Sequence, residues 1–152
     1  MAIEATLSGY KKNNTLITIA ILAGMAAWLF YDGKYNNKFI EKHTNPDGTP
    51  DSTLNIHREG PPYLLAGAAL VGGYFFYIKN KKIIADDNSL HVNRQKISYA
   101  DIRSIDKTYF SKKGFFTINY SRNGMDCRLK ISDRTYDNLQ ALLEHLVAKI
   151  ST

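Results

Sequence analysis

Two long apolar stretches dominate the first half of the chain, Leu16 to Tyr31 and Tyr63 to Ile78. Neither contains Asp, Glu, Lys or Arg. Each is close to the ~17 residues that a helix needs to cross the hydrocarbon core of a bilayer. Aromatic residues, which favour the membrane interface, lie at the end of both stretches. The pattern predicts transmembrane helices at 15–31 and 62–78.

Two other interpretations of these stretches remain open at this point. Either stretch has a length that also suits a buried core helix of a soluble protein. The first stretch also resembles a secretory signal peptide, because Lys11 and Lys12 precede it and Gly24-Met25-Ala26 is similar to a small-residue cleavage site. We expect the first stretch to be retained as a membrane anchor.

Small residues recur four positions apart within both stretches. Residues with this spacing lie on one face of a helix, where small side chains allow a second helix backbone to approach closely. The predicted helix-packing residues are Ala20, Gly24, Ala68, Ala69, Gly72 and Gly73. The two spans can use these residues to pack on each other as a hairpin, or to pack against a larger partner.

Beyond the second stretch, the pattern changes to the alternation that is typical of half-buried strands. Phe116, Ile118 and Tyr120 point one way, while the polar residues between them point the other. Asn123-Gly124 is a strong hairpin signal. On the predicted return strand, Cys127, Leu129 and Ile131 point inward, and Asp126, Arg128 and Lys130 point outward.

The last segment is predicted to be an amphipathic helix that closes the sheet. Asp133 is the expected N-cap. Apolar residues then recur at intervals of three and four, namely Tyr136, Leu139, Leu143, Leu146 and Ile150. The fold class is therefore a membrane α+β protein, with two transmembrane helices followed by a small antiparallel β-sheet domain and a C-terminal helix.

The distribution of charge predicts the topology. The chain has a formal net charge of +6, and acids balance bases up to residue 78. Basic residues flank both spans, with Lys11 and Lys12 before the first and Lys79, Lys81 and Lys82 after the second. Because retained Lys and Arg mark the cytoplasmic side, we expect both ends of the chain in the cytoplasm and an integral membrane location, in a bacterial inner membrane.

The expected organisation follows from these boundaries. Residues 1–14 form a cytoplasmic N-terminal segment, 32–61 an external loop between the spans, and 79–152 the cytoplasmic domain. The single cysteine, Cys127, cannot form an internal disulfide and is expected to be a small core residue.

Two segments of the domain resemble a known family. Ile84 to Val92, followed by Lys96 to Ile102, is similar to the opening of bacterial pleckstrin-homology-like (PH-like) domains. Members of that family commonly follow one or two membrane helices and have a β-hairpin, an I-x-[WY]-x-D-I segment, further meander strands and a closing helix. The resemblance covers 79–152. Lipid-headgroup recognition is not carried over, because His91 and Asn93 stand where phosphoinositide-binding relatives have a basic strand motif.

No pattern of catalytic residues is found. The histidines His43, His57, His91 and His145 have no metal-ligand spacing, and His145 is expected on the exposed side of the last helix. The sequence contains no Gly-rich phosphate loop, nucleophile elbow or HExxH segment. We therefore expect a protein that is not an enzyme and has no cofactor.

The loop between the spans contains alternating oxygen donors at Asn45, Asp47, Thr49 and Asp51. A calcium loop begins with similar spacing, but such a loop needs a glutamate at its twelfth position, and prolines interrupt this one. We expect turns here and no metal site. The length of the segment favours docking on another surface.

Basic residues of the domain form the expected membrane or partner surface. They are Lys79, Lys81, Lys82, Lys112, Lys113, Arg122 and Arg128. Their mixture with Tyr109 and Tyr120 also suits nucleic acid, but an anionic leaflet beside a tethered domain is the simpler partner.

Two function classes follow. The chain is either a non-catalytic accessory or scaffolding subunit of a larger membrane protein complex, or an independent membrane-surface module that binds anionic lipid headgroups or a peptide. The small-residue positions and the long loop favour the first.

Overall fold

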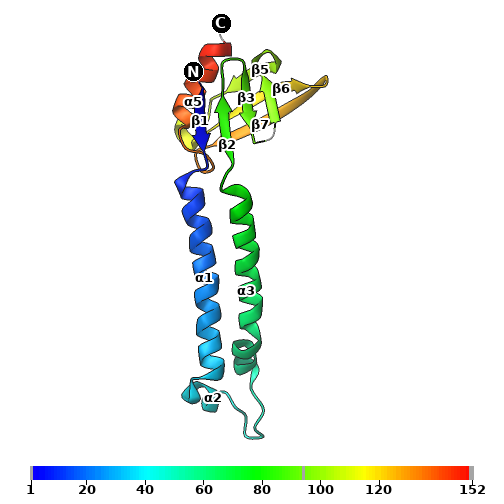
Figure 1. The fold of residues 1–152 in the computed structure, drawn as a ribbon. Helices are drawn as coiled ribbons and strands as arrows, with labels where there is room; N and C mark the ends of the chain where they lie inside the picture. Colours follow the sequence, from blue (N-terminus) through cyan, green and yellow to red (C-terminus); the bar gives the residue numbers. More distant parts are fainter. Residues whose placement is uncertain (1, 94, 151–152) are drawn as a thin grey trace. The chain divides into compact units, whose positions relative to one another are not determined.

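The computed structural model describes residues 2–93 and 95–150 and divides into two compact units (Figure 1). The first unit joins residues 1–12 to 77–152, and the second contains residues 13–76. Each unit has its own organisation. The predicted α+β class is confirmed at the level of two long apolar helices that pack together, antiparallel sheets, and a C-terminal helix that contacts a sheet.

The helical unit is a hairpin of two long helices with a short one between them. Its elements are α1 (Gly9–Lys34), α2 (Asn37–Lys42) and α3 (Ser52–Ile78). Buried and half-buried positions recur every three or four residues along α1 and α3, as a helix pair with one shared seam requires. The seam includes Thr15 and Ala26 on α1, and Leu54 and Ala68 on α3.

Helix α3 begins well before the predicted boundary at residue 62, so part of the predicted loop 32–61 is helical. The carboxylate of Asp51 accepts a hydrogen bond from the Leu54 N–H at 2.8 Å and so caps the helix. Pro61 and Pro62 lie inside α3. A proline within a helix removes the N–H that the carbonyl four residues earlier would accept.

One of these freed carbonyls, that of His57, lies against Gly33 of α1. A Cβ at Gly33 of α1 would stand 2.7 Å from the His57 carbonyl oxygen, so only glycine fits. Arg58 Nε in turn donates to the Gly33 carbonyl at 3.2 Å. The prolines therefore open the backbone of α3 where α1 lies against it.

The other unit contains two antiparallel sheets, in the orders β1-β2-β3-β4 and β5-β6-β7. The strands are β1 (Ile3–Thr6), β2 (Lys82–Ala85), β3 (Ser89–Val92), β4 (Gln95–Ser98), β5 (Ile102–Asp106), β6 (Phe115–Arg122) and β7 (Met125–Ser132). The helical elements are η1 (Tyr99–Asp101), α4 (Phe110–Lys113) and α5 (Leu139–Ile150).

The alternation predicted for β6 and β7 is confirmed. Phe116, Ile118 and Tyr120 are buried, and they pair across the ladder with Ile131, Leu129 and Cys127, in that order. Asn123 and Gly124 both have positive φ, 51° and 77°, as the predicted tight hairpin turn requires. The inward faces of both sheets meet the buried side of α5 in one hydrophobic core.

Strand β1 lies within the segment 1–14, where no strand was predicted. This strand pairs with β2 in antiparallel register, with Glu4 opposite Ile84. Ala5 and Leu7 are 0% and 2% exposed, so the segment supplies core residues as well as backbone pairing. The sheet unit is therefore built from both ends of the chain.

The predicted start of the last helix is wrong by several residues. Helix α5 begins at Leu139, after Asn138 with a φ of 62°. Asp133 does not cap it; the carboxylate of Asp133 instead occupies the space over Gly114, where no Cβ would fit. Tyr136 forms an isolated β-bridge with Leu7, so N-terminal pairing replaces the first predicted turn.

Candidate functional site

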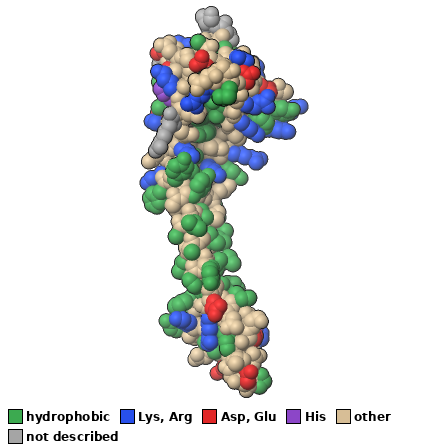
Figure 2. Space-filling model, turned by 90° about the vertical axis from the view of Figure 1, so that its right-hand side faces the viewer, with side chains coloured by type: hydrophobic (Ala, Val, Ile, Leu, Met, Phe, Trp, Pro, Cys, Tyr) green, Lys and Arg blue, Asp and Glu red, His purple; other side chains and the backbone are tan. Residues whose placement is uncertain are grey.

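The surface of the helical hairpin is strongly apolar. Both α1 and α3 are long and apolar enough to span a membrane, yet only 17% and 11% of their apolar windows are buried. On the face drawn in Figure 2, hydrophobic side chains cover the middle of the helical hairpin, while Lys and Arg lie on the sheet unit and at the base of the hairpin. A core helix of a soluble protein would be mostly buried, so this exposure separates α1 and α3 from that interpretation.

The predicted small residues are divided between the seam and the open surface. Ala68 is buried and Gly72 half-buried at the edge of the seam. Ala20 and Gly24, and Ala69 and Gly73, are exposed. At 100° of rotation per residue, these exposed pairs lie about 160° from the centre of the seam on each helix. They occupy the faces that point away from the hairpin contact.

Different glycines make the contact inside the hairpin. Gly33 touches the α3 backbone, and added Cβ atoms at Gly60 and Gly67 would meet Leu29 and Leu22 at 3.5 and 3.8 Å. An added Cβ at Gly24, Gly72 or Gly73 would meet nothing within 4 Å. The hairpin therefore leaves these three predicted packing positions open, and sequence spacing alone did not identify Gly33.

The predicted basic residues lie in several parts of the sheet unit. Lys79, Lys81 and Lys82 follow α3, and Lys82 pairs with Glu4 at 3.3 Å. Lys112 and Lys113 form the end of α4. Arg122 is at the β6–β7 hairpin, and Arg128 Nε donates to Asn119 Oδ1 at 3.2 Å.

Lysines and aromatic rings pair on this surface. The Nζ atoms of Lys113 and Lys130 lie 4.9 and 3.7 Å from the ring centroids of Tyr109 and Phe115, in that order. These two rings stack on each other at 5.6 Å. Lys81 Nζ lies 4.3 Å from the Tyr77 ring centroid. Aromatic rings with cations beside them suit an anionic bilayer interface.

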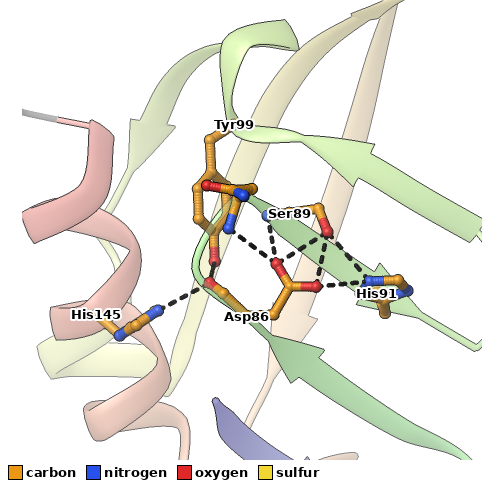
Figure 3. Close-up of polar contacts among 6 residues, drawn as sticks. Asp86, Ser89, His91, Tyr99 and His145 are labelled. Carbon is orange, nitrogen blue, oxygen red and sulfur yellow. Dashed lines mark hydrogen bonds and ion pairs between the residues drawn. The ribbon is translucent and has the colours of Figure 1, made fainter. Parts of the chain in front are cut away.

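A polar cluster surrounds the turn between β2 and β3 (Figure 3). The Asp86 carboxylate accepts hydrogen bonds from the backbone N–H groups of Asn88 and Ser89 at 2.9 and 2.6 Å, and from Ser89 Oγ. Its second oxygen lies 2.9 Å from His91 Nε2. The N–H of Asn88 is the main cause that holds the pKa of Asp86 well below its ordinary value.

The same residue also accepts hydrogen bonds at its backbone carbonyl. Tyr99 Oη donates to the Asp86 carbonyl at 2.7 Å, and His145 Nε2 lies 3.1 Å from it. Burial is the main cause that raises the pKa of Tyr99 to about 12. The expectation that His145 is on the exposed side of the helix is wrong: it faces the sheet and ties α5 to this turn.

Asp86, Ser89 and His91 do not have the geometry of a nucleophile and its base. In a serine relay, the hydroxyl and the carboxylate contact opposite nitrogens of the histidine ring. Here Ser89 Oγ and Asp86 Oδ2 lie 3.1 and 2.9 Å from the same atom, His91 Nε2. Ser89 is also only 1% exposed. The arrangement serves to hold the turn.

A second polar cluster lies where the end of α1, the start of α3 and the segment between them meet. Asp32 and His57 are 7% and 8% exposed, and His57 Nδ1 lies 3.8 Å from Asp32 Oδ2, beyond hydrogen-bond distance. The Phe39 ring is 4.4 Å from the rings of both His43 and His57. These side chains form the packed base of the hairpin.

The oxygen donors of the predicted loop are engaged separately. Asp47 accepts from the N–H and hydroxyl of Thr49 at 2.9 and 2.6 Å. Asp51 caps α3 and lies 2.8 Å from His43 Nδ1. Within residues 2–93 and 95–150, no three His, Cys, Asp or Glu side chains form a group that could hold a metal ion.

Comparisons with protein-family models, with curated proteins and with solved structures found no match to this chain. The function must therefore be inferred from the helix faces and the basic surface themselves.

Proposed function

We propose that this chain is a non-catalytic, integral-membrane accessory subunit of a larger membrane protein complex. In this proposal, α1 and α3 cross the membrane, and the sheet unit is a PH-like domain that docks on a cytoplasmic face. The observation that carries the proposal is the pair of small-residue faces, Ala20/Gly24 and Ala69/Gly73, which point away from the hairpin seam and have no partner helix among the described residues.

The pairing of β1 with β2 supports the two-span topology. These strands precede α1 and follow α3, and their ladder requires both to be on one side of any membrane that the hairpin crosses. The basic residues Lys11, Lys12, Lys79, Lys81 and Lys82 are adjacent to the same two strands, which favours the cytoplasm for that side. The PH-like interpretation is supported by two successive antiparallel sheets followed by a C-terminal helix.

Thiol labelling tests the topology. Cys127 is first replaced by Ser, and a single cysteine is then placed at Thr49, in the loop, or at Ser111, in the sheet unit. We expect an impermeant reagent to reach Thr49→Cys only from outside and Ser111→Cys only from inside. Labelling of both positions from one side would contradict a two-span anchor.

Isolation in mild detergent tests the complex. We expect other subunits to co-purify at fixed stoichiometry with the native chain and to be lost from Gly24→Leu/Gly73→Leu, because the added side chains keep a partner helix from approaching. A change in salt concentration should neither restore the subunits to the variant nor release them from the native chain. Salt screens surface charges beyond about 8 Å at physiological ionic strength, but it does not weaken the contact between two apolar helices.

A matched control adds bulk elsewhere on the same helices. Ile21→Phe/Leu65→Phe enlarges side chains that are 55% and 54% exposed but lie about 100° from the seam. This variant should retain the partners. A native chain that purifies alone as a monomer or homodimer would instead favour the alternative, an independent module that binds lipid headgroups or a peptide at the membrane surface.

A further inference from the structure

A basic hollow lies in the sheet unit beside the start of α1. Its volume is about 610 Å³, within the range of small-molecule sites. Three elements line it: Tyr10 comes from the first turn of α1, Lys112 and Lys113 from α4, and Arg134 from the segment after β7. Asp133 is the one acidic side chain in the lining, so the site carries an excess of positive charge.

Hydrogen bonds fix the walls of this hollow in place. Ser8, 1% exposed, accepts from the Lys11 N–H at 3.1 Å and donates to the Arg134 carbonyl at 2.8 Å through its hydroxyl. Its own N–H donates to the Thr135 carbonyl at 2.8 Å. On the opposite side, the Asp133 N–H donates to the Gly114 carbonyl at 2.9 Å. The backbone segments that carry Lys112, Lys113 and Arg134 are therefore held in place by hydrogen bonds.

The side chains that line the hollow suit a phosphate ester at a bilayer surface. Lys112 and Arg134 make no ion pair among the described residues, so their charges are available to an anion. Tyr10 is 61% exposed and Tyr109, beside Lys113, is 45% exposed. Tyrosines with lysines are typical of the headgroup region of a membrane.

The position of Tyr10 along the chain favours a lipid over a soluble phosphate compound as the ligand of the hollow. Tyr10 lies in α1, only a few residues before the apolar stretch that begins at Leu16. If α1 spans the bilayer, Tyr10 and the hollow that it lines are held near the headgroups, where anionic lipid is present at high local concentration.

We infer that this hollow binds the headgroup of an anionic phospholipid, with Lys112, Lys113 and Arg134 contacting the phosphate and Tyr10 lying beside the glycerol. The inference rests on the membrane insertion proposed above. It assigns the start of α1, α4 and the segment after β7 to one site, and it gives the sheet unit a fixed attachment to the leaflet from which its helices emerge.

The test uses the full chain in a neutral detergent and native mass spectrometry. The chain is titrated with dihexanoylphosphatidylglycerol, with dihexanoylphosphatidylcholine and with inorganic phosphate. We expect one phosphatidylglycerol to bind in preference to both other probes. In Lys112→Gln/Arg134→Gln its Kd should rise by roughly tenfold or more, because two cations near the phosphate are lost.

The control removes the same charge from another part of the domain. Lys96→Gln/Arg103→Gln alters two exposed bases, one on β4 and one on β5, that do not line the hollow. The Kd of this variant for phosphatidylglycerol should change by less than about twofold, because charges farther than a Debye length from the bound phosphate are largely screened. A charge-conserving variant, Lys112→Arg/Arg134→Lys, should keep most of the binding and shows that loss in the Gln variant does not reflect misfolding.

Each other outcome overturns the inference. Equal weakening in the two Gln variants would mean diffuse attraction without a site. Inorganic phosphate that binds as tightly as phosphatidylglycerol would assign the hollow to a soluble phosphate compound. Equal binding of phosphatidylcholine would remove the charge preference. Extraction of the native chain from membranes by alkali is a separate readout, and it would contradict membrane insertion whatever the titration gives.

Discussion

The helical hairpin and the sheet unit bury apolar side chains to very different extents. In the sheet unit, Leu90, Leu142 and Leu146 are each 0% exposed. In the hairpin, Leu70 is 77% and Phe76 67% exposed, although their sequence surroundings are more apolar. The sheet unit buries its apolar side chains in a closed core, as a domain in water must, whereas the hairpin leaves such side chains exposed. The difference supports the proposal that the hairpin has a membrane as its solvent, whereas the sheet unit has water.

The largest effect is expected from removing β1 from the sheet unit. A fragment of residues 77–152 lacks the strand that pairs with β2 and the buried side chains of Ala5 and Leu7. We expect this fragment not to show a cooperative unfolding transition in urea. Replacing residues 13–76 by a short Gly/Ser linker, which keeps β1, should restore the transition. A cooperative 77–152 fragment of equal stability would show that β1 is dispensable.

A smaller effect should distinguish buried from exposed leucines. Leu143 is 6% exposed and packs in the core, so Leu143→Ala in the linker-joined sheet unit should lower the free energy of unfolding by about 2 to 5 kcal/mol. Leu70→Ala, in the full chain in detergent, should cost less than about 0.5 kcal/mol, because Leu70 is exposed in the structure and would face detergent in the proposed membrane span. Similar losses at both positions would contradict the two-solvent comparison.

Inside the hairpin, one glycine is expected to be more sensitive than the others. Gly33→Ala places a Cβ against the His57 carbonyl, and backbone must move to relieve the contact. We expect a loss of about 1 to 3 kcal/mol in the stability of the hairpin in detergent. Gly24→Ala, with nothing within 4 Å of the new atom, is the matched control and should be neutral or slightly stabilising. Thermal unfolding of the full chain measures both.

The smallest effect is expected in how the free energy of unfolding of the sheet unit depends on acidic pH. Because the folded pKa of Asp86 is lowered, its ionised form contributes stability above the unfolded pKa of about 3.9, and this contribution is lost as the pH falls toward the folded value. Asp86→Asn keeps the acceptor for the turn but cannot titrate. Urea unfolding between about pH 5 and pH 2 should therefore show a shallower dependence on pH in Asp86→Asn. Identical slopes would remove Asp86 from the acid response.

The local pattern of apolar and polar residues predicted those parts of the fold in which the interacting residues are close in the sequence. The two apolar helices, the faces of β6 and β7 and the Asn123-Gly124 turn all follow from residues within a few positions of each other. The sequence did not predict β1, because four residues, Ile3 to Thr6, contain too few positions to show alternation and their partners lie at 82–85. Nor did it predict that Pro61-Pro62 would stay inside a helix.

The sequence indicated which types of residue would form the candidate surfaces, but not how these residues are arranged in space. The small residues were predicted from their spacing, and only packing distances separate Gly33, inside the hairpin, from Gly24 and Gly73, outside it. The lysines of α4 were identified, but Tyr10 and Arg134 were not associated with them. Spacing along the chain could not join three segments that meet only because β1 and the segment after β7 fold together.

The ladder between β1 and β2 also has a consequence for biosynthesis. Residues 3–6 leave the ribosome before their partners at 82–85, which follow only after both apolar helices have been made. Because a strand cannot pair before its partner has been synthesised, β1 stays without its ladder until residue 85 has left the ribosome. If the hairpin spans a membrane as proposed, a chain in which only one of the two helices had crossed would hold β1 and β2 on opposite sides and prevent their ladder from forming.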